Sequence, residues 1–179
     1  MTEDQLVQYA VEEGFAAAAV VDTAKIPFDD SFRVYCQENL CGKYGVNYSC
    51  PPGCGSPEEM RRRITARKRA LVLQTIWEIS DYTDNKAIKE AKASHNAAAL
   101  RLAKRLRGEN CPGFVVGASG CALCNPCALV KGEPCRFPEQ QYSCMSAYCI
   151  FVRELTEQCG IEYDCGPGLL AFFGMYVCD

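Results

Sequence analysis

Histidine and tryptophan are almost missing from this sequence: each occurs once, as His95 and Trp77. A single imidazole excludes most catalytic relays that depend on histidine. The G-x-S-x-G, Walker A and G-x-G-x-x-G patterns are also absent, so the common signatures of a serine nucleophile or a nucleotide site are missing. The sequence therefore assigns no catalytic residue. We expect His95, which falls on the apolar stripe of a helix, to be a core or interface residue rather than a metal ligand.

Long hydrophobic runs and a strong charge of one sign are absent too. The longest apolar run, Phe15 to Val21, is too short to cross a bilayer. The first residues, MTEDQLVQ, have neither the basic start nor the apolar centre of a signal peptide. The formal net charge of −3 does not suggest the basic face that binds nucleic acid. We expect a cytoplasmic protein that binds neither membranes nor nucleic acid.

Cysteine is abundant, with 14 residues in a chain of 179. A disulfide framework is disfavoured, because thiols stay reduced in the cytoplasm and the chain is long enough to form a core without cross-links. Metal ligation is the better explanation for at least eight of these cysteines. So many free thiols also suggest an anaerobic or well-reduced compartment.

The clearest metal-binding pattern is a C-terminal group of cysteines with C-x2-C-x2-C spacing and a fourth thiol further on. The group is Cys121, Cys124, Cys127 and Cys135. Bacterial ferredoxins use a similar C-x2-C-x2-C-x3-C-P run to hold a cubane iron–sulfur cluster, although here the fourth cysteine comes later. Structural zinc sites usually combine two C-x2-C pairs, so zinc is the alternative. We expect Gly117 and Gly120 to allow close approach of the backbone to sulfur.

A second, N-terminal group has less regular spacing and consists of Cys36, Cys41, Cys50 and Cys54. The sequence CPPGC predicts a stiff loop that positions its flanking thiols. These four residues can hold a second cluster, or they can share one site with the C-terminal group. We rank two separate sites slightly ahead of one shared site.

Six cysteines belong to neither group, and most of them are expected to be small buried side chains. Two of the six, Cys144 and Cys149, follow the C-terminal group closely enough to be alternative ligands or redox thiols. The six are Cys111, Cys144, Cys149, Cys159, Cys165 and Cys178.

The sequence pattern predicts one domain over residues 1–179, with an α/β or α+β fold in which helices cover a single sheet. Two cysteine-rich loops, at residues 36–54 and 111–138, interrupt the regular elements. Capping boxes and glycine stops define the helices, while short apolar runs define the strands. The predicted helices are residues 2–13, 56–68, 84–107 and 143–158, and the predicted strands are 15–21, 69–77, 114–117, 161–163 and 169–177.

Several of these segments together resemble a prokaryotic family of cysteine-rich predicted metal-binding proteins, domain of unknown function 2284. The resemblance comprises CGKYG from Cys41, CPPGC with SPEE, GASGCALCNPC, EPCRFPE and MSAYCIFV. The family has M-E-A-Y-G-I-D-V in the last segment, so Ser146, Cys149 and Phe151 differ from it here. The resemblance implies metal binding by Cys41, Cys50, Cys121, Cys124, Cys127 and Cys135, and it implies no reaction.

The layout of the chain is also similar to that of the epoxyqueuosine reductase and reductive dehalogenase group, which combines a corrinoid-binding domain with ferredoxin-like cysteines. Three functions remain open at this point. The first is a protein with one or two [4Fe–4S] clusters that transfers electrons to a redox partner protein. The second is a zinc-stabilised structural or adaptor module. The third is an iron–sulfur oxidoreductase that uses its cluster with a corrinoid, a flavin or a small substrate.

Overall fold

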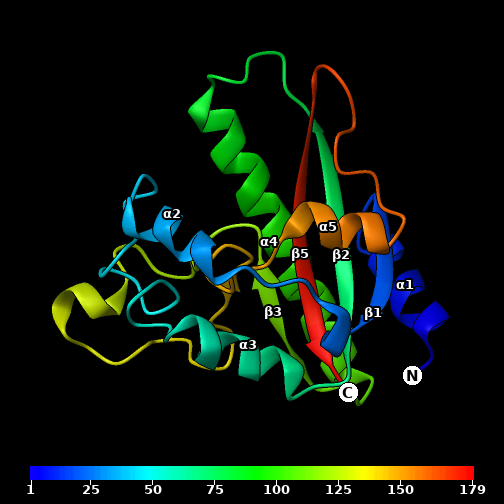
Figure 1. Cartoon of the computed structure of the whole chain (residues 1–179), viewed down its shortest axis with the longest axis horizontal. Helices are drawn as coiled ribbons and strands as arrows, with labels where there is room; N and C mark the ends of the chain where they lie inside the picture. Colours follow the sequence, from blue (N-terminus) through cyan, green and yellow to red (C-terminus); the bar gives the residue numbers. More distant parts are fainter.

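A computed structural model describes residues 1–179 and shows an α+β fold around one mixed sheet (Figure 1). The strand order is β1-β2-β5-β3-β4, and only β3 and β4 run parallel to each other. The long strands β2 and β5 pair along their whole length and form the centre of the sheet. The strands are β1 (Ala17–Asp22), β2 (Arg69–Glu78), β3 (Gly113–Gly117), β4 (Ser143–Cys144) and β5 (Leu169–Cys178).

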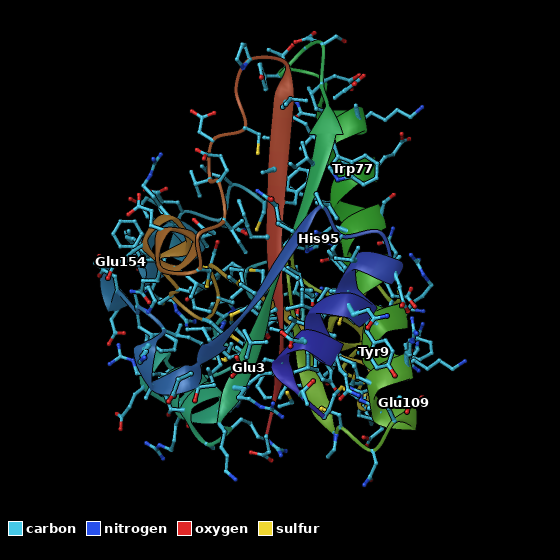
Figure 2. All side chains as sticks on the ribbon, turned by 90° about the vertical axis from the view of Figure 1, so that its right-hand side faces the viewer. Glu3, Tyr9, Trp77, His95, Glu109 and Glu154 are labelled. Carbon is cyan, nitrogen blue, oxygen red and sulfur yellow. The ribbon has the colours of Figure 1, made fainter.

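Five α-helices and three short 3-10 segments accompany the sheet. The helices lie on both of its faces, as the view turned by 90° shows most clearly (Figure 2). The helices are α1 (Glu3–Glu12), α2 (Arg33–Gln37), α3 (Pro57–Thr65), α4 (Asn85–Gly108) and α5 (Val152–Gln158). The 3-10 segments are η1 (Thr23–Lys25), η2 (Asp30–Phe32) and η3 (Ala128–Lys131). None of the helices combines the length and the apolar character needed to cross a membrane.

Helices α1 and α4 cover one face of the sheet and form one half of the core. Leu6 of α1 and Leu102 of α4 are fully buried against Leu71 and Tyr176 of the central strands. His95 of α4 is also fully buried in this layer (Figure 2), where its Nδ1 lies 2.8 Å from Thr75 Oγ1. The prediction that His95 is a core residue is therefore confirmed.

Helices α3 and α5 pack on the opposite face, next to the segments that carry the cysteines. Met60 of α3 and Leu155 of α5 are fully buried with Val72 and Met175 of the sheet. Ser56 caps α3 by accepting a hydrogen bond from the Glu59 amide, and the Glu59 carboxylate accepts one from the Ser56 amide. This capping box confirms the predicted start of α3 and fixes where the chain leaves the first cysteine-rich loop.

The region between residues 143 and 163 differs from its prediction. The expected helix over 143–158 is wrong in its first half, because Ser143–Cys144 is the edge strand β4 and helix begins only at Val152. Cys149 has a φ of 56°, a left-handed conformation that cannot continue a right-handed helix. Residues 161–163, predicted as a strand, lie outside every strand. Conversely, the short helix α2 occurs in a stretch for which the sequence predicted no regular structure.

Candidate metal centre

The two cysteine-rich segments, which are distant in sequence, lie side by side at one end of the molecule (Figure 1). The Asn47 side-chain amide donates to the Cys121 carbonyl at 2.9 Å, and the Cys121 amide donates to Ser49 Oγ at 2.9 Å. Tyr48 donates its hydroxyl proton to the Glu133 carbonyl at 2.8 Å. Three consecutive residues of the first segment therefore hold the second segment in place.

The C-terminal cysteines line one small cavity. All four members of the group, Cys121, Cys124, Cys127 and Cys135, face a cavity of about 10 Å³. That volume is comparable to the space occupied by a single water molecule. Five residues complete the lining: Asn47, Tyr48, Leu123, Phe137 and Gln141. The cavity contains the four thiols that sequence spacing assigned to one centre and none of the N-terminal group.

Backbone amides favour the thiolate form at the centre of this group. Burial acts to raise the pKa of the Cys127 thiol, but hydrogen bonds from the Tyr48 and Leu129 amides outweigh it and lower the pKa overall. Cys124 and Lys43 add to this lowering. At Cys121 burial dominates and raises the pKa, although the site also contains amide donors. Cys127 therefore loses its proton more readily than an ordinary thiol does.

The N-terminal group reaches this region through Cys50, which lies against the backbone of Gly120. A Cβ atom on Gly120 would come within 2.9 Å of Cys50 Sγ and 3.5 Å of Ser49 Oγ. Gly120 therefore permits close approach to a sulfur, as expected, but the sulfur belongs to the other cysteine group. Gly117 instead makes room for Asn96 and Tyr142, whose atoms would lie 2.8 Å from an added Cβ.

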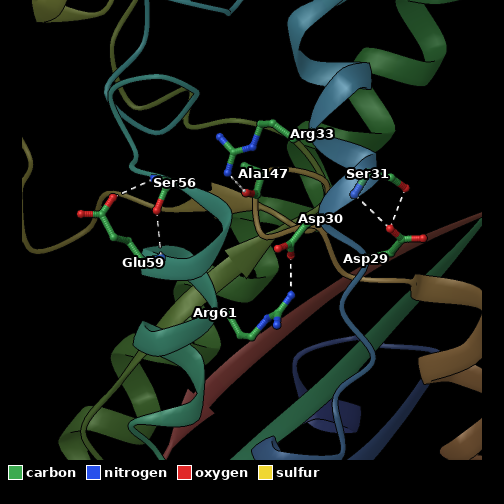
Figure 3. A network of polar contacts seen from close by, with 8 residues as sticks. All are labelled: Asp29, Asp30, Ser31, Arg33, Ser56, Glu59, Arg61 and Ala147. Atoms are coloured by element: carbon green, nitrogen blue, oxygen red, sulfur yellow. Dashed lines mark hydrogen bonds and ion pairs between the residues drawn. The ribbon is translucent and has the colours of Figure 1, made fainter.

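A cation that the sequence pattern did not indicate, Arg33 of α2, lies among the N-terminal thiols. Its Nη1 is 3.8 Å from Cys54 Sγ, and its Nη2 donates to the Ala147 carbonyl at 2.9 Å (Figure 3). Burial raises the pKa of Cys54, Cys36 and Cys149, and in all three cases the charge of Arg33 opposes that rise. Arg33 therefore provides positive charge where several thiols would otherwise be buried among apolar atoms.

Strand β4, which ends at Cys144, and the turn after it, which contains Cys149, lie on the same side as the N-terminal cysteines. The Cys149 carbonyl accepts a hydrogen bond from the Asp29 amide at 2.8 Å, which joins this turn to the segment before α2. Arg61 of α3 forms an ion pair with Asp30 on the same surface (Figure 3). Burial raises the pKa of the Cys144 thiol to about 12, and the Cys149 side chain is fully buried.

Asn96 of α4 positions the start of the C-terminal cysteine segment and is itself 2% exposed. Its Oδ1 accepts a hydrogen bond from the Ala118 amide at 2.9 Å, and its Nδ2 donates to Ser119 Oγ at 2.8 Å. The only sequence signal for this role was an amide side chain within the otherwise apolar buried stripe of α4. The contact joins residues distant in sequence, so local pattern analysis does not find it.

The thiols are neither cross-linked nor gathered to chelating distance. All 14 cysteines are free, as expected for a protein without a disulfide framework. No three histidine, cysteine, aspartate or glutamate side chains are arranged to hold a metal ion. The structure brings together the C-terminal thiols around one cavity, and it brings Cys50 against Gly120 of the same segment, whereas Cys41 is exposed.

A family profile described as "Predicted metal-binding protein (DUF2284)" matches residues 19–177 of the chain. The chain belongs to this family. The match covers both cysteine segments and nearly the whole sheet, and it supports metal binding as the general property of the protein. No curated protein and no solved structure matches the chain.

Proposed function

We propose that Cys121, Cys124, Cys127 and Cys135 hold an iron–sulfur cluster and that this member of the metal-binding family transfers electrons. The observation that carries the proposal is that all four thiols, with a ferredoxin-like spacing, line one cavity. Cysteine thiolates are the usual ligands of iron–sulfur clusters. The cluster, when bound, would supply a site that accepts and releases single electrons.

The surroundings of the cavity fit an anionic centre. Amides of Tyr48 and Leu129 point toward Cys127 sulfur, and such N–H donors stabilise negative charge on ligating sulfur. Tyr48 comes from the first cysteine segment and is anchored by its hydroxyl on Glu133. The first segment would therefore act as a cover that supplies hydrogen bonds to a centre ligated by the second segment.

The N-terminal group supports a second centre, separate from the first. Cys36, Cys41, Cys50 and Cys54 would be its thiol ligands, and Arg33 would balance the negative charge of the thiolates. None of these four cysteines lines the C-terminal cavity, which favours two sites over one shared site. Because Cys50 contacts Gly120, the two proposed centres would be neighbours, an arrangement that would suit passing electrons toward a redox partner protein.

A single zinc ion is the second candidate, and one observation favours it. The cavity among the C-terminal thiols has a volume of about 10 Å³, which is closer to the size of one ion than to that of a cubane. Zinc in a four-cysteine site would make the protein a structural or adaptor module rather than an electron carrier.

Anoxic purification followed by metal and sulfide analysis distinguishes an iron–sulfur cluster from a single zinc ion. The iron–sulfur proposal predicts a brown protein whose visible absorption bleaches with dithionite and whose reduced form gives an EPR signal. Replacement of one cavity thiol, Cys124→Ser, should remove one centre and its share of the iron. The matched control is Cys159→Ser, at the C-terminal end of α5 and outside the cavity lining, which should retain the full iron content. Colourless protein with stoichiometric zinc would overturn the iron–sulfur proposal.

A further inference from the structure

A cavity with a volume of about 340 Å³ lies outside both cysteine groups. It is bounded by the first half of β5, the loop before β5, the turn after β4 and the residue that follows β3. Its size is at the lower end of the range for small-molecule sites. Ten of its twelve lining residues are hydrophobic, and Asp164 is the only charged one.

One wall of the cavity is an open strand edge. Strand β5 pairs with β2 over its whole length, but β3 pairs only with Met175–Cys178. Residues 169–173 of β5 therefore have no strand partner on the β3 side, and these same residues line the cavity. Such an edge presents backbone N–H donors and C=O acceptors to whatever fills the space.

Two aromatic side chains of the lining stack on each other. The rings of Tyr163 and Phe173 are stacked, with centroids 5.5 Å apart and an interplanar angle of 1°. Arg153 of α5 lies 4.4 Å from the Tyr163 ring centroid and holds that ring in place. Phe173 is buried at 8% exposure, whereas Tyr163 is 37% exposed, so Tyr163 stands at the mouth of the cavity.

Several residues of the cavity lining are close neighbours in sequence of cysteines. Ala118, in its lining, is three residues before Cys121, so their Cα atoms are at most about 11 Å apart. Met145 and Ser146, also in the lining, immediately follow Cys144. A molecule bound here would be a close neighbour of the metal-binding region.

These features select one chemical class of ligand. Apolar walls and parallel aromatic rings favour a flat, conjugated molecule. An open strand edge is best satisfied by a ring with a C=O next to an N–H, since that lactam edge accepts and donates at once. The lone carboxylate of Asp164 disfavours anions, and the volume is too small for a corrinoid or a complete dinucleotide.

We propose that this cavity binds a small, uncharged, planar heteroaromatic molecule with a lactam edge, of the flavin or pteridine ring type. The ring would lie between the aromatic side chains and Met145, with its lactam edge against β5. The proposal concerns binding alone, so it does not depend on which metal the cysteines hold.

Equilibrium dialysis of the metal-containing protein against lumiflavin tests this proposal, because dialysis is insensitive to the colour of a metal centre. The expected result is saturable binding of one lumiflavin per chain. With 3-methyllumiflavin, which lacks the lactam proton, affinity should fall about tenfold, as expected for one lost hydrogen bond. Absence of saturable lumiflavin binding, or equal affinity for both compounds, would overturn the proposal.

Variants locate the binding. Ser146→Phe places a large ring in the cavity from an exposed position and should abolish binding, while Ser94→Phe, on the exposed side of α4, should leave binding unchanged. Tyr163→Ala should weaken binding, and Tyr163→Phe should preserve it, because the ring at position 163 supports the Phe173 ring by stacking on it. Unchanged binding by Ser146→Phe would show that lumiflavin binds elsewhere. Metal content is measured on every sample, so that a loss of lumiflavin binding can be distinguished from a loss of bound metal.

Discussion

Replacing Gly120 with alanine should disrupt the contact between the two cysteine segments. The added Cβ would lie 2.9 Å from Cys50 Sγ, closer than such atoms normally approach. Cys50 is 6% exposed, so its sulfur has little free space into which it can rotate. Either that sulfur or the backbone at Gly120 must move, and overpacking of this kind typically costs about 1–3 kcal/mol.

Gly108→Ala is the matched control, because a Cβ at Gly108 would have no atom within 4 Å. Gly108 is also the last residue of α4, where alanine is favoured over glycine by up to about 1 kcal/mol. Denaturant unfolding of metal-depleted protein should show Gly120→Ala destabilised and Gly108→Ala unchanged or slightly stabilised. Metal content of the anoxic protein should fall in Gly120→Ala alone. A loss below about 0.5 kcal/mol with full metal content would refute the inferred packing of the segments.

Three further predictions concern Asn96, His95 and Cys149. Asn96→Ala removes two hydrogen bonds and leaves the Ala118 amide without its partner. The free energy of unfolding should therefore fall by about 2 kcal/mol in denaturant titrations. A variant as stable as the original protein would contradict the positioning role of Asn96. Burial lowers the pKa of His95 to about 4, from an ordinary value of 6.5, so the neutral form is favoured in the folded state. Below pH 6.5 the unfolded state binds a proton at His95 that the folded state does not, so the free energy of unfolding falls. This decline begins near pH 6.5, continues toward pH 4 and amounts to about 3 kcal/mol in total. His95→Gln, which does not titrate, should lack that decline when unfolding is measured across this pH range. Glycine adopts the observed φ of 56° without strain, so Cys149→Gly should keep or raise the melting temperature. A lower melting temperature would show that packing of the buried Cys149 thiol stabilises the fold by more than the backbone strain costs.

Patterns among neighbouring residues in the sequence predicted most of the helices and strands. The capping box of Thr2 and Gln5 fixed the start of α1, and that of Ser56 and Glu59 fixed the start of α3. Both depend on residues within one helical turn, so the pattern is complete in the sequence itself. The apolar periodicity over residues 84–107 likewise predicted helix α4 almost to its observed bounds, Asn85–Gly108.

Features that depend on contacts between distant residues were not predictable in this way. The start of α5 was misplaced because a left-handed residue, Cys149, interrupts a segment with acceptable helical composition. The cationic role of Arg33 arises only when α2 packs against the turn at Ala147. The four cysteines that spacing placed together line one cavity, because they belong to one short segment, and their role as metal ligands stays a prediction. The placement of Cys50 beside Gly120 required the fold.

Iron and acid-labile sulfide, quantified together with EPR spectra before and after dithionite on anoxically prepared protein, test the central claim most directly. The account predicts iron and sulfide in equal amounts, an EPR signal that appears on reduction, and loss of one centre in Cys124→Ser. Zinc without sulfide, or full iron and sulfide content in Cys124→Ser, would contradict the assignment of a cluster to the cavity formed by Cys121, Cys124, Cys127 and Cys135.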